Sequence, residues 1–258
     1  MLLHHVDLGG TGRPPLLLLH GLLGSSRNWQ TTGRDLAESY HVFALDARNH
    51  GRSPHAATAS PELMMRDVTG WMDARDMAAA AIIGHSMGGR TAMLLACRHP
   101  ARVTRLVVVD VAPRDYPGLG HWTHFDALLA LDLATLRSRQ EAEERLAASV
   151  SDLGQRKFLV TNLAQDDSGR WYWTVNLPVL ASSLPAFEAN PLRPDDRYAG
   201  PVLFIRGGRS SYIQPGDEPA IRAHFPAARV ATIADAGHNP HIDRREEFVT
   251  LVRAIART

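Results

Sequence analysis

The segment GHSMG, residues 84–88, could supply a nucleophile. A serine hydroxyl attacks a carbonyl group effectively only when it is held clear of the backbone and beside a base. A sharp turn from a strand into a helix exposes the hydroxyl, and the residues two places to either side must then be small. Apolar residues 80–83 precede the segment, and Gly84 and Gly88 flank the serine at this spacing. The pattern therefore predicts Ser86 as the nucleophile of an acyl-transfer reaction.

The base that would activate this serine is predicted near the end of the chain. His238 lies in AGHNPHID, directly after an apolar run over residues 229–235 and a glycine. Where a serine sits in the G-x-S-x-G turn, the nucleophile comes first along the chain and the histidine last. We therefore expect His238 to take the proton of Ser86.

Acyl transfer also needs two preorganised N–H donors for the negative oxygen of the tetrahedral intermediate. One donor is the amide of the residue after the nucleophile, which is Met87 here. The other comes from the loop after an early strand, and LLLLHGLLGSS places Leu22 there. Because only their main-chain N–H groups would act, the two side chains give no guide.

The residue that would orient the histidine is less obvious, because the usual place for an acid holds a serine. The loop after the next-to-last predicted strand has the sequence IRGGRSSYI, with Ser210 and Ser211 where a carboxylate is common. A hydroxyl can accept a hydrogen bond from an imidazole, but it cannot stabilise an imidazolium by charge. A carboxylate must therefore come from elsewhere.

Asp110 is the favoured carboxylate. It ends RLVVVD, the strand expected beside the one that carries Ser86, and neighbouring strands lie roughly 4.8 Å apart. Its side chain should emerge at the same sheet edge and reach His238. Asp217 and Asp235 remain the alternatives.

The elements that must position these residues form an alternating pattern. Apolar runs bounded by turn residues alternate with helical segments, as expected for a parallel sheet buried on both faces. The runs cover residues 15–21, 41–47, 80–86, 103–111, 201–207 and 229–235. The alternation stops near residue 113 and resumes near 200. We predict an α/β core formed by residues 1–113 and 200–258, with a helical cap or lid inserted at 114–199. Aromatic residues of this insertion are predicted to line an acyl pocket: Trp122, Phe125, Trp171 and Trp173.

Composition narrows the class of protein. The chain has 258 residues, of which 45% are hydrophobic, and a formal charge of +1. Its arginines are scattered, so a nucleic acid is not an expected partner. Cys97 is the only cysteine, which excludes an internal disulfide and a thiolate metal cluster. No apolar leader or membrane-spanning segment is visible, so we expect a cytoplasmic protein. We also expect an enzyme that uses neither cofactor nor metal. The oligomeric state is left open.

Taken together, the motifs resemble one branch of the α/β-hydrolase superfamily, the abhydrolase-domain-11-like esterases, which include bacterial short-chain acyl esterases of the YbfF type. The resemblance spans nearly the whole chain. Its marks are HGLLGSSRNW, DARNHGRSPH, GHSMGGR, VVVDVAP, FLVTNL, WTVNL, IRGGRSSYI and AGHNPHID. It implies an α/β-hydrolase fold and hydrolysis of carboxylic esters, extending to acyl-CoA thioesters. It also implies that Asp110 serves the histidine and that Ser210, rather than Ser211, is an auxiliary hydrogen-bonding group.

Two other functions share parts of this pattern. A lyase or C–C hydrolase of the same fold, such as the menaquinone-pathway synthase, also carries HGxLGS and GxSMGGR. Its relatives place an acid where this chain has the serine of GGRS, which argues against it. A ligand-binding homologue without turnover is the other alternative, and the complete set of nucleophile, base and oxyanion donors argues against that.

Overall fold

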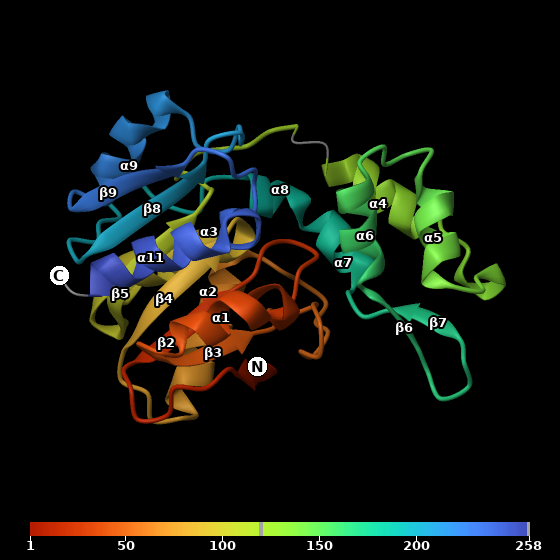
Figure 1. The fold of residues 1–258 in the computed structure, drawn as a ribbon, viewed down its shortest axis with the longest axis horizontal. Coiled ribbons are helices and arrows are strands. Elements are labelled where there is room, and N and C mark those ends of the chain that lie inside the picture. The colour runs from red at the N-terminus through yellow and green to blue at the C-terminus, as the bar shows by residue number, and fades with distance from the viewer. Residues whose placement is uncertain (119–120, 257–258) are drawn as a thin grey trace.

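A seven-stranded sheet lies at the centre of the larger part of the molecule, with the strand order β1-β3-β2-β4-β5-β8-β9 (Figure 1). The computed structural model describes residues 1–118 and 121–256. The strands are β1 (His5–Asp7), β2 (Pro15–Leu19), β3 (His41–Leu45), β4 (Ala80–His85), β5 (Val103–Val109), β8 (Val202–Gly207) and β9 (Ala228–Ile233). All neighbours pair in parallel except β1, which runs antiparallel to β3. The predicted α/β fold class and its six parallel strands are confirmed. The short edge strand β1 was not predicted.

Helices cover both faces of this sheet, which explains why its central strands are apolar runs. Every residue of β4 is buried. Residues of α2 (Pro61–Asp73), α3 (Met87–Arg98) and α9 (Glu218–His224) belong to the hydrophobic cluster on one face. Residues of α1 (Gln30–Leu36) and α11 (Arg245–Ala256) belong to the cluster on the other. The short helix α10 (Pro240–Asp243) precedes α11. Single 3-10 turns cover Ser26–Trp29, Pro100–Arg102, Leu133–Thr135 and Pro215–Asp217.

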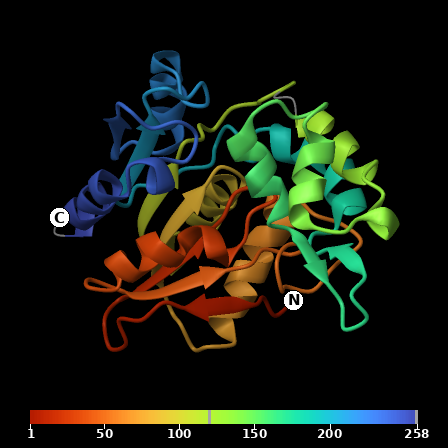
Figure 2. The ribbon, with the colours of Figure 1, turned by 45° about the vertical axis from the view of Figure 1, so that its right-hand side comes forward.

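The segment between β5 and β8 lies to one side of the sheet and forms its own cluster of helices (Figures 1 and 2). Its elements are α4 (His121–Leu129), α5 (Arg139–Leu146), α6 (Leu153–Val160), β6 (Leu163–Gln165), β7 (Trp171–Trp173), α7 (Leu177–Ser182) and α8 (Leu184–Glu188). A third hydrophobic cluster joins these elements to Leu23, Met64 and Met87 of the sheet part. The segment therefore packs over the edge of the sheet where α3 begins. Its role as a cap, and its bounds at residues 114 and 199, stay a prediction.

The two chain crossings into this segment lie side by side, and Arg90 of α3 holds both. Its guanidinium donates to the carbonyl of Arg114 (2.9 Å) at one crossing and to those of Glu188 (3.4 Å) and Ala189 at the other. The amide of Tyr116 also donates to the Glu188 carbonyl at 2.8 Å. A residue of α3 therefore fixes where the segment leaves and rejoins the sheet. Within the described ranges, no helix has the length and apolar character needed to cross a bilayer.

Candidate active site

Ser86 occupies the turn between β4 and α3 in a backbone conformation that side chains rarely adopt. Its φ is 51° and its ψ is −114°. Such a conformation persists only where the surroundings hold it. The Ser86 amide donates to the Val109 carbonyl of β5 at 3.0 Å, and its carbonyl accepts from the Arg90 amide at 3.0 Å. The serine is therefore held at the carboxyl edge of the sheet.

The two flanking glycines are required by close approach of the backbone. A Cβ atom at Gly84 would lie 2.2 Å from the carbonyl oxygen of Gly88. A Cβ atom at Gly88 would lie 2.5 Å from the carbonyl oxygen of Leu19. Both distances are far below van der Waals contact, so alanine at either position would push the turn apart. This agrees with the spacing argument that singled out the segment.

Asp110 and His238 meet at the same edge. The ring of His238, in the loop between β9 and α10, donates from Nδ1 to Oδ2 of Asp110 at 2.8 Å. Asp110 is fully buried, and its own φ of 51° places it at a second sharp turn directly after β5. Its Oδ1 accepts from the amide of Gly207 at 3.1 Å, and its Oδ2 also accepts from the Ser210 hydroxyl. These donors compensate a buried carboxylate for the loss of water.

The other carboxylates weighed for this place are engaged elsewhere. Asp217 forms an ion pair with Arg114, with Nε and Oδ1 2.9 Å apart. Asp235 pairs with Arg244 at 3.1 Å, and its side chain is 69% exposed. Among the described residues, neither has a hydrogen bond or ion pair with His238.

Ser210 contacts the network in a way that the sequence did not indicate. Its hydroxyl donates to the Asp110 carboxylate, and its oxygen accepts from the amide of Tyr212 at 3.2 Å. The sequence suggested a serine that bonds directly to the imidazole. The structure instead places Ser210 behind the carboxylate, while Ser211 is exposed. Ser210 therefore contacts the carboxylate that bonds to His238, and not the imidazole itself.

His238 is held from two further sides. The Nε2–H of His85, the residue before Ser86, donates to the main-chain carbonyl of His238 at 2.8 Å. Burial keeps the pKa of His85 well below its ordinary value, so this ring stays neutral and adds no charge beside His238. The ring of Tyr212 stacks on the His238 ring with centroids 3.7 Å apart and planes at 19°. Sequence reasoning missed Tyr212, which only its place two residues after Ser210 could have suggested.

The Ser86 hydroxyl shares this edge with His238, but in the part of the chain that the structure describes no hydrogen bond joins them. Such bonds are often long before a substrate binds. Because Asp110 occupies Nδ1, the nitrogen left for Ser86 is Nε2.

A pocket surrounds Ser86 and the two predicted oxyanion donors. Its lining residues are Leu22, Ser86, Met87, Arg90, Val111, Tyr116, Phe187, Glu188 and Tyr212. Met87 is the first residue of α3, so its amide has no acceptor within the helix. The amide of Leu22 has no acceptor among the described residues.

The aromatic residues predicted for an acyl pocket lie elsewhere, and that prediction needs correction. Phe125 is 1% exposed within the third hydrophobic cluster, whereas the side chain of Trp122 is 45% exposed. Trp171 and Trp173 both pack against that cluster, because alternate residues of a strand face the same side. None of the four lines the pocket at Ser86, where Tyr116, Phe187 and Tyr212 supply the aromatic rings.

The described residues offer no cluster of three or more histidine, cysteine or acidic side chains that could hold a metal ion. Burial raises the pKa of the Cys97 thiol to about 12, so this cysteine is a poor nucleophile.

Comparison with known proteins agrees with this geometry. The model of the alpha/beta hydrolase fold family matches residues 14–245. The mouse sn-1-specific diacylglycerol lipase ABHD11 is 38% identical over 95% of this chain and 81% of its own length. Esterase YbfF of Escherichia coli is 32% identical over 93% of this chain and 91% of its own.

A solved structure described as a marine microorganism esterase superimposes with a TM-score of 0.95 at 33% identity, covering 99% of both chains. This likeness extends over the segment between β5 and β8 as well as the sheet. The chain therefore belongs to the α/β-hydrolase family, within the branch of carboxylic ester hydrolases that includes the abhydrolase-domain-11-like and YbfF-type esterases.

Proposed function

We propose that this protein hydrolyses carboxylic esters through an acyl-enzyme formed on Ser86. The observation that carries the proposal is the buried contact between Asp110 and Nδ1 of His238, at the edge where Ser86 ends its strand. A carboxylate in this place fixes the imidazole tautomer and stabilises the imidazolium that forms when Nε2 takes a proton. The arrangement supports the roles of nucleophile, base and acid for these three residues.

The reaction follows from this assignment. Oγ of Ser86 attacks the ester carbonyl while Nε2 of His238 accepts the hydroxyl proton. The oxygen of the tetrahedral intermediate receives hydrogen bonds from the amides of Leu22 and Met87. As the intermediate collapses, the imidazolium returns its proton to the leaving alcohol, and the acyl group stays on Ser86. A water molecule, deprotonated by His238, then releases the carboxylic acid and regenerates the serine. None of these steps needs a cofactor.

The residues that line the pocket indicate the kind of substrate. Leu22, Met87, Val111 and Phe187 give it an apolar lining, which suits the acyl part of an ester. The mouse relative is named as a diacylglycerol lipase, and the Escherichia coli relative as an esterase. We therefore propose small to medium acyl esters as substrates, with acyl thioesters as a second class to be tested. Cytoplasmic localisation stays a prediction.

The experiment that tests the proposal measures turnover of p-nitrophenyl butyrate by the wild type and by Ser86→Ala. We expect a burst of p-nitrophenol and labelling of Ser86 by a fluorophosphonate probe in the wild type, and neither in the variant. Wild-type turnover by Ser86→Ala would refute the assignment of the nucleophile. Esters left intact while a lyase substrate is consumed would favour the lyase alternative. Absence of both activities would favour the ligand-binding alternative.

A further inference from the structure

We propose that His50 and Asn162 are positioning residues for the oxyanion hole. They bind the main-chain amide and the main-chain carbonyl of Leu23. This fixes the direction in which the N–H of the preceding residue, Leu22, points. The inference rests on the proposed function. It also gives a role to two motifs singled out in the sequence, DARNHGRS and FLVTNL, that the reaction itself does not use.

Leu23 is held in a strained conformation by both of its peptide groups. Its φ is 59°, in the left-handed region that a leucine rarely adopts. Its amide donates to Nε2 of His50 at 3.2 Å, from the loop after β3. Its carbonyl accepts from Nδ2 of Asn162 at 2.8 Å, from the segment after α6. Leu23, Asn162 and His50 are all buried. The turn is closed by the bond from the Gly24 amide to the Gly21 carbonyl at 3.0 Å, and it is held by one contact from the sheet part and one from the segment between β5 and β8.

The peptide before Leu22 is held as well. Nε2 of His20 accepts from the amide of Ala47 at 3.0 Å, so Nδ1 carries the proton and donates to the carbonyl of Gly21 at 2.8 Å. That carbonyl and the Leu22 N–H belong to one planar trans peptide and point in opposite directions. Fixing the carbonyl turns the Leu22 N–H away from His20. With Leu23 also held, both neighbours of the donor are immobilised.

His50 can act only as an acceptor toward Leu23. Its Nδ1–H donates to the carbonyl of Arg48 at 2.9 Å, which leaves Nε2 unprotonated. Burial lowers the pKa of His50 to about 3, so the ring stays in this state under any ordinary condition. A protonated ring would turn a second N–H toward the Leu23 amide and break the contact. The ring also packs edge-on against His20, with centroids 5.0 Å apart.

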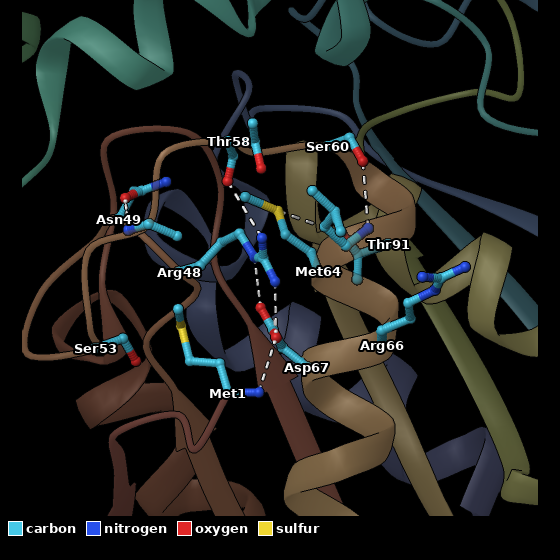
Figure 3. Close-up of polar contacts among 12 residues, drawn as sticks. Met1, Arg48, Asn49, Ser53, Thr58, Ser60, Met64, Arg66, Asp67 and Thr91 are labelled. Atoms are coloured by element: carbon cyan, nitrogen blue, oxygen red, sulfur yellow. Dashed lines mark hydrogen bonds and ion pairs between the residues drawn. The ribbon is translucent and has the colours of Figure 1, made fainter.

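The Arg48 carbonyl that orients His50 is itself fixed. The Arg48 guanidinium forms two hydrogen bonds with the buried carboxylate of Asp67 on α2, at 2.6 and 2.9 Å. Figure 3 shows this pair, together with the bond from Arg48 to the Thr58 carbonyl at 3.2 Å. The loop with the sequence DARNHGRS is therefore bound to α2 through Arg48, and its His50 contacts the turn that carries Leu22 and Leu23.

Two substitutions at His50 separate positioning from packing. The Oε1 of glutamine can take the place of Nε2, so His50→Gln keeps an acceptor for Leu23. The Nδ2 of asparagine can take the place of Nδ1, so His50→Asn keeps the bond to Arg48 and loses the one to Leu23. With p-nitrophenyl butyrate, we expect kcat of His50→Asn to fall about 10- to 100-fold with KM within about twofold, a fraction of the effect of losing a whole oxyanion donor. His50→Gln should stay within about threefold of the wild type. His99→Asn, at an exposed histidine, is the matched control.

A second readout follows the oxyanion directly. An alkyl boronic acid forms a tetrahedral adduct on Ser86 and so probes the same donors as the transition state. Its affinity should fall in His50→Asn by about the factor lost in kcat, and should be retained in His50→Gln. Asn162→Asp, which removes the donor to the Leu23 carbonyl from the cap side, should lower kcat and boronate affinity about 10-fold. This second variant keeps the test intact if His50→Asn does not fold.

The outcomes separate this inference from the proposed function. It is overturned if folded His50→Asn and Asn162→Asp both stay within threefold of the wild type, or if His50→Gln is impaired as much as His50→Asn. Thermal unfolding midpoints establish that the compared variants are folded. If Ser86→Ala retains turnover, the proposed function fails instead, whatever the His50 variants do.

Discussion

Replacing Asp110 by asparagine should remove most of the catalytic rate and leave substrate binding nearly unchanged. Asp110 is fully buried, and its Oδ2 lies 2.8 Å from Nδ1 of His238. At an effective dielectric constant of about 20, two unit charges at this distance attract by about 6 kcal/mol. This attraction exists only once the ring is protonated, that is, on the way to the transition state. A loss of this size corresponds to about 10⁴ in rate. Because an amide keeps a hydrogen bond to the ring, we expect kcat to fall about 10³- to 10⁴-fold.

The assay is steady-state turnover of p-nitrophenyl butyrate, with KM and kcat determined separately and the fold checked by circular dichroism. Asp217→Asn is the matched control, because Asp217 pairs with Arg114 and was a rival for the same role. The double variant Asp110→Asn/Ser210→Asp moves the charge to the position where the Ser210 hydroxyl now contacts Oδ2. We expect it to recover at least about 10-fold of the lost rate, because that position lies close to the ring. A folded Asp110→Asn variant that keeps more than a tenth of wild-type kcat would refute the reasoning, and so would a larger loss in Asp217→Asn.

Two further predictions concern groups outside the reaction. Burial lowers the pKa of His50 and of His241 to about 3, whereas the same histidines in the unfolded chain titrate near 6.5. As the pH falls from about 6.5 toward 3, the unfolded state takes up protons that the native state refuses, so the free energy of unfolding should fall by about 1.4 kcal/mol per pH unit for each histidine. Urea unfolding at pH 7, 6 and 5 measures this dependence. In His241→Gln the free energy of unfolding should fall less steeply with decreasing pH, by the contribution of one histidine. The same pH dependence in the variant and the wild type would contradict the low pKa of His241. Burial also raises the pKa of Cys97 to about 12 from an ordinary 9.0, which lowers its thiolate fraction at pH 8 about 1,000-fold. Because a thiolate of higher pKa is also more nucleophilic, we expect its reaction with a disulfide reagent at pH 8 to be at least about 30-fold slower in the native protein than in urea. Equal rates in the two states would contradict this.

The fold could be predicted because the sheet strands are buried on both faces. The central parallel strands are apolar runs ended by turn residues, so the alternation with helices was visible in the sequence. The edge strand β9 is the least regular, since Arg229 and Thr232 are exposed. The edge strand β1 was missed because its three residues are only partly covered and carry no apolar run. The hairpin β6–β7 was missed for a similar reason, since each of its strands has three residues.

Some residues of the candidate site could likewise be predicted from the sequence, and others could not. Residues that end a strand, such as Ser86 and Asp110, could be found because parallel strands deliver their carboxyl ends to one edge. Contacts made between loops could not be found from spacing. The stack of Tyr212 on His238 and the bond from Asn162 to Leu23 join residues far apart in the chain, with no periodic signal. Aromatic content suggested the wrong pocket lining, because Phe125, Trp171 and Trp173 pack within the segment between β5 and β8 and Trp122 is exposed.

The contacts of Arg90 have a consequence for how this enzyme can change its substrates. Its guanidinium donates to main-chain carbonyls where the chain leaves and rejoins the sheet, and a carbonyl is the same whichever side chain accompanies it. The guanidinium also lies over the ring of Tyr116, 4.9 Å from its centroid. Much of the sequence between the two crossings can therefore be replaced without loss of the attachment point, provided that Tyr116 stays beside Arg90 and Asn162 keeps its bond to Leu23. Selection can act on the specificity of the insertion while the chemistry beneath it keeps its geometry.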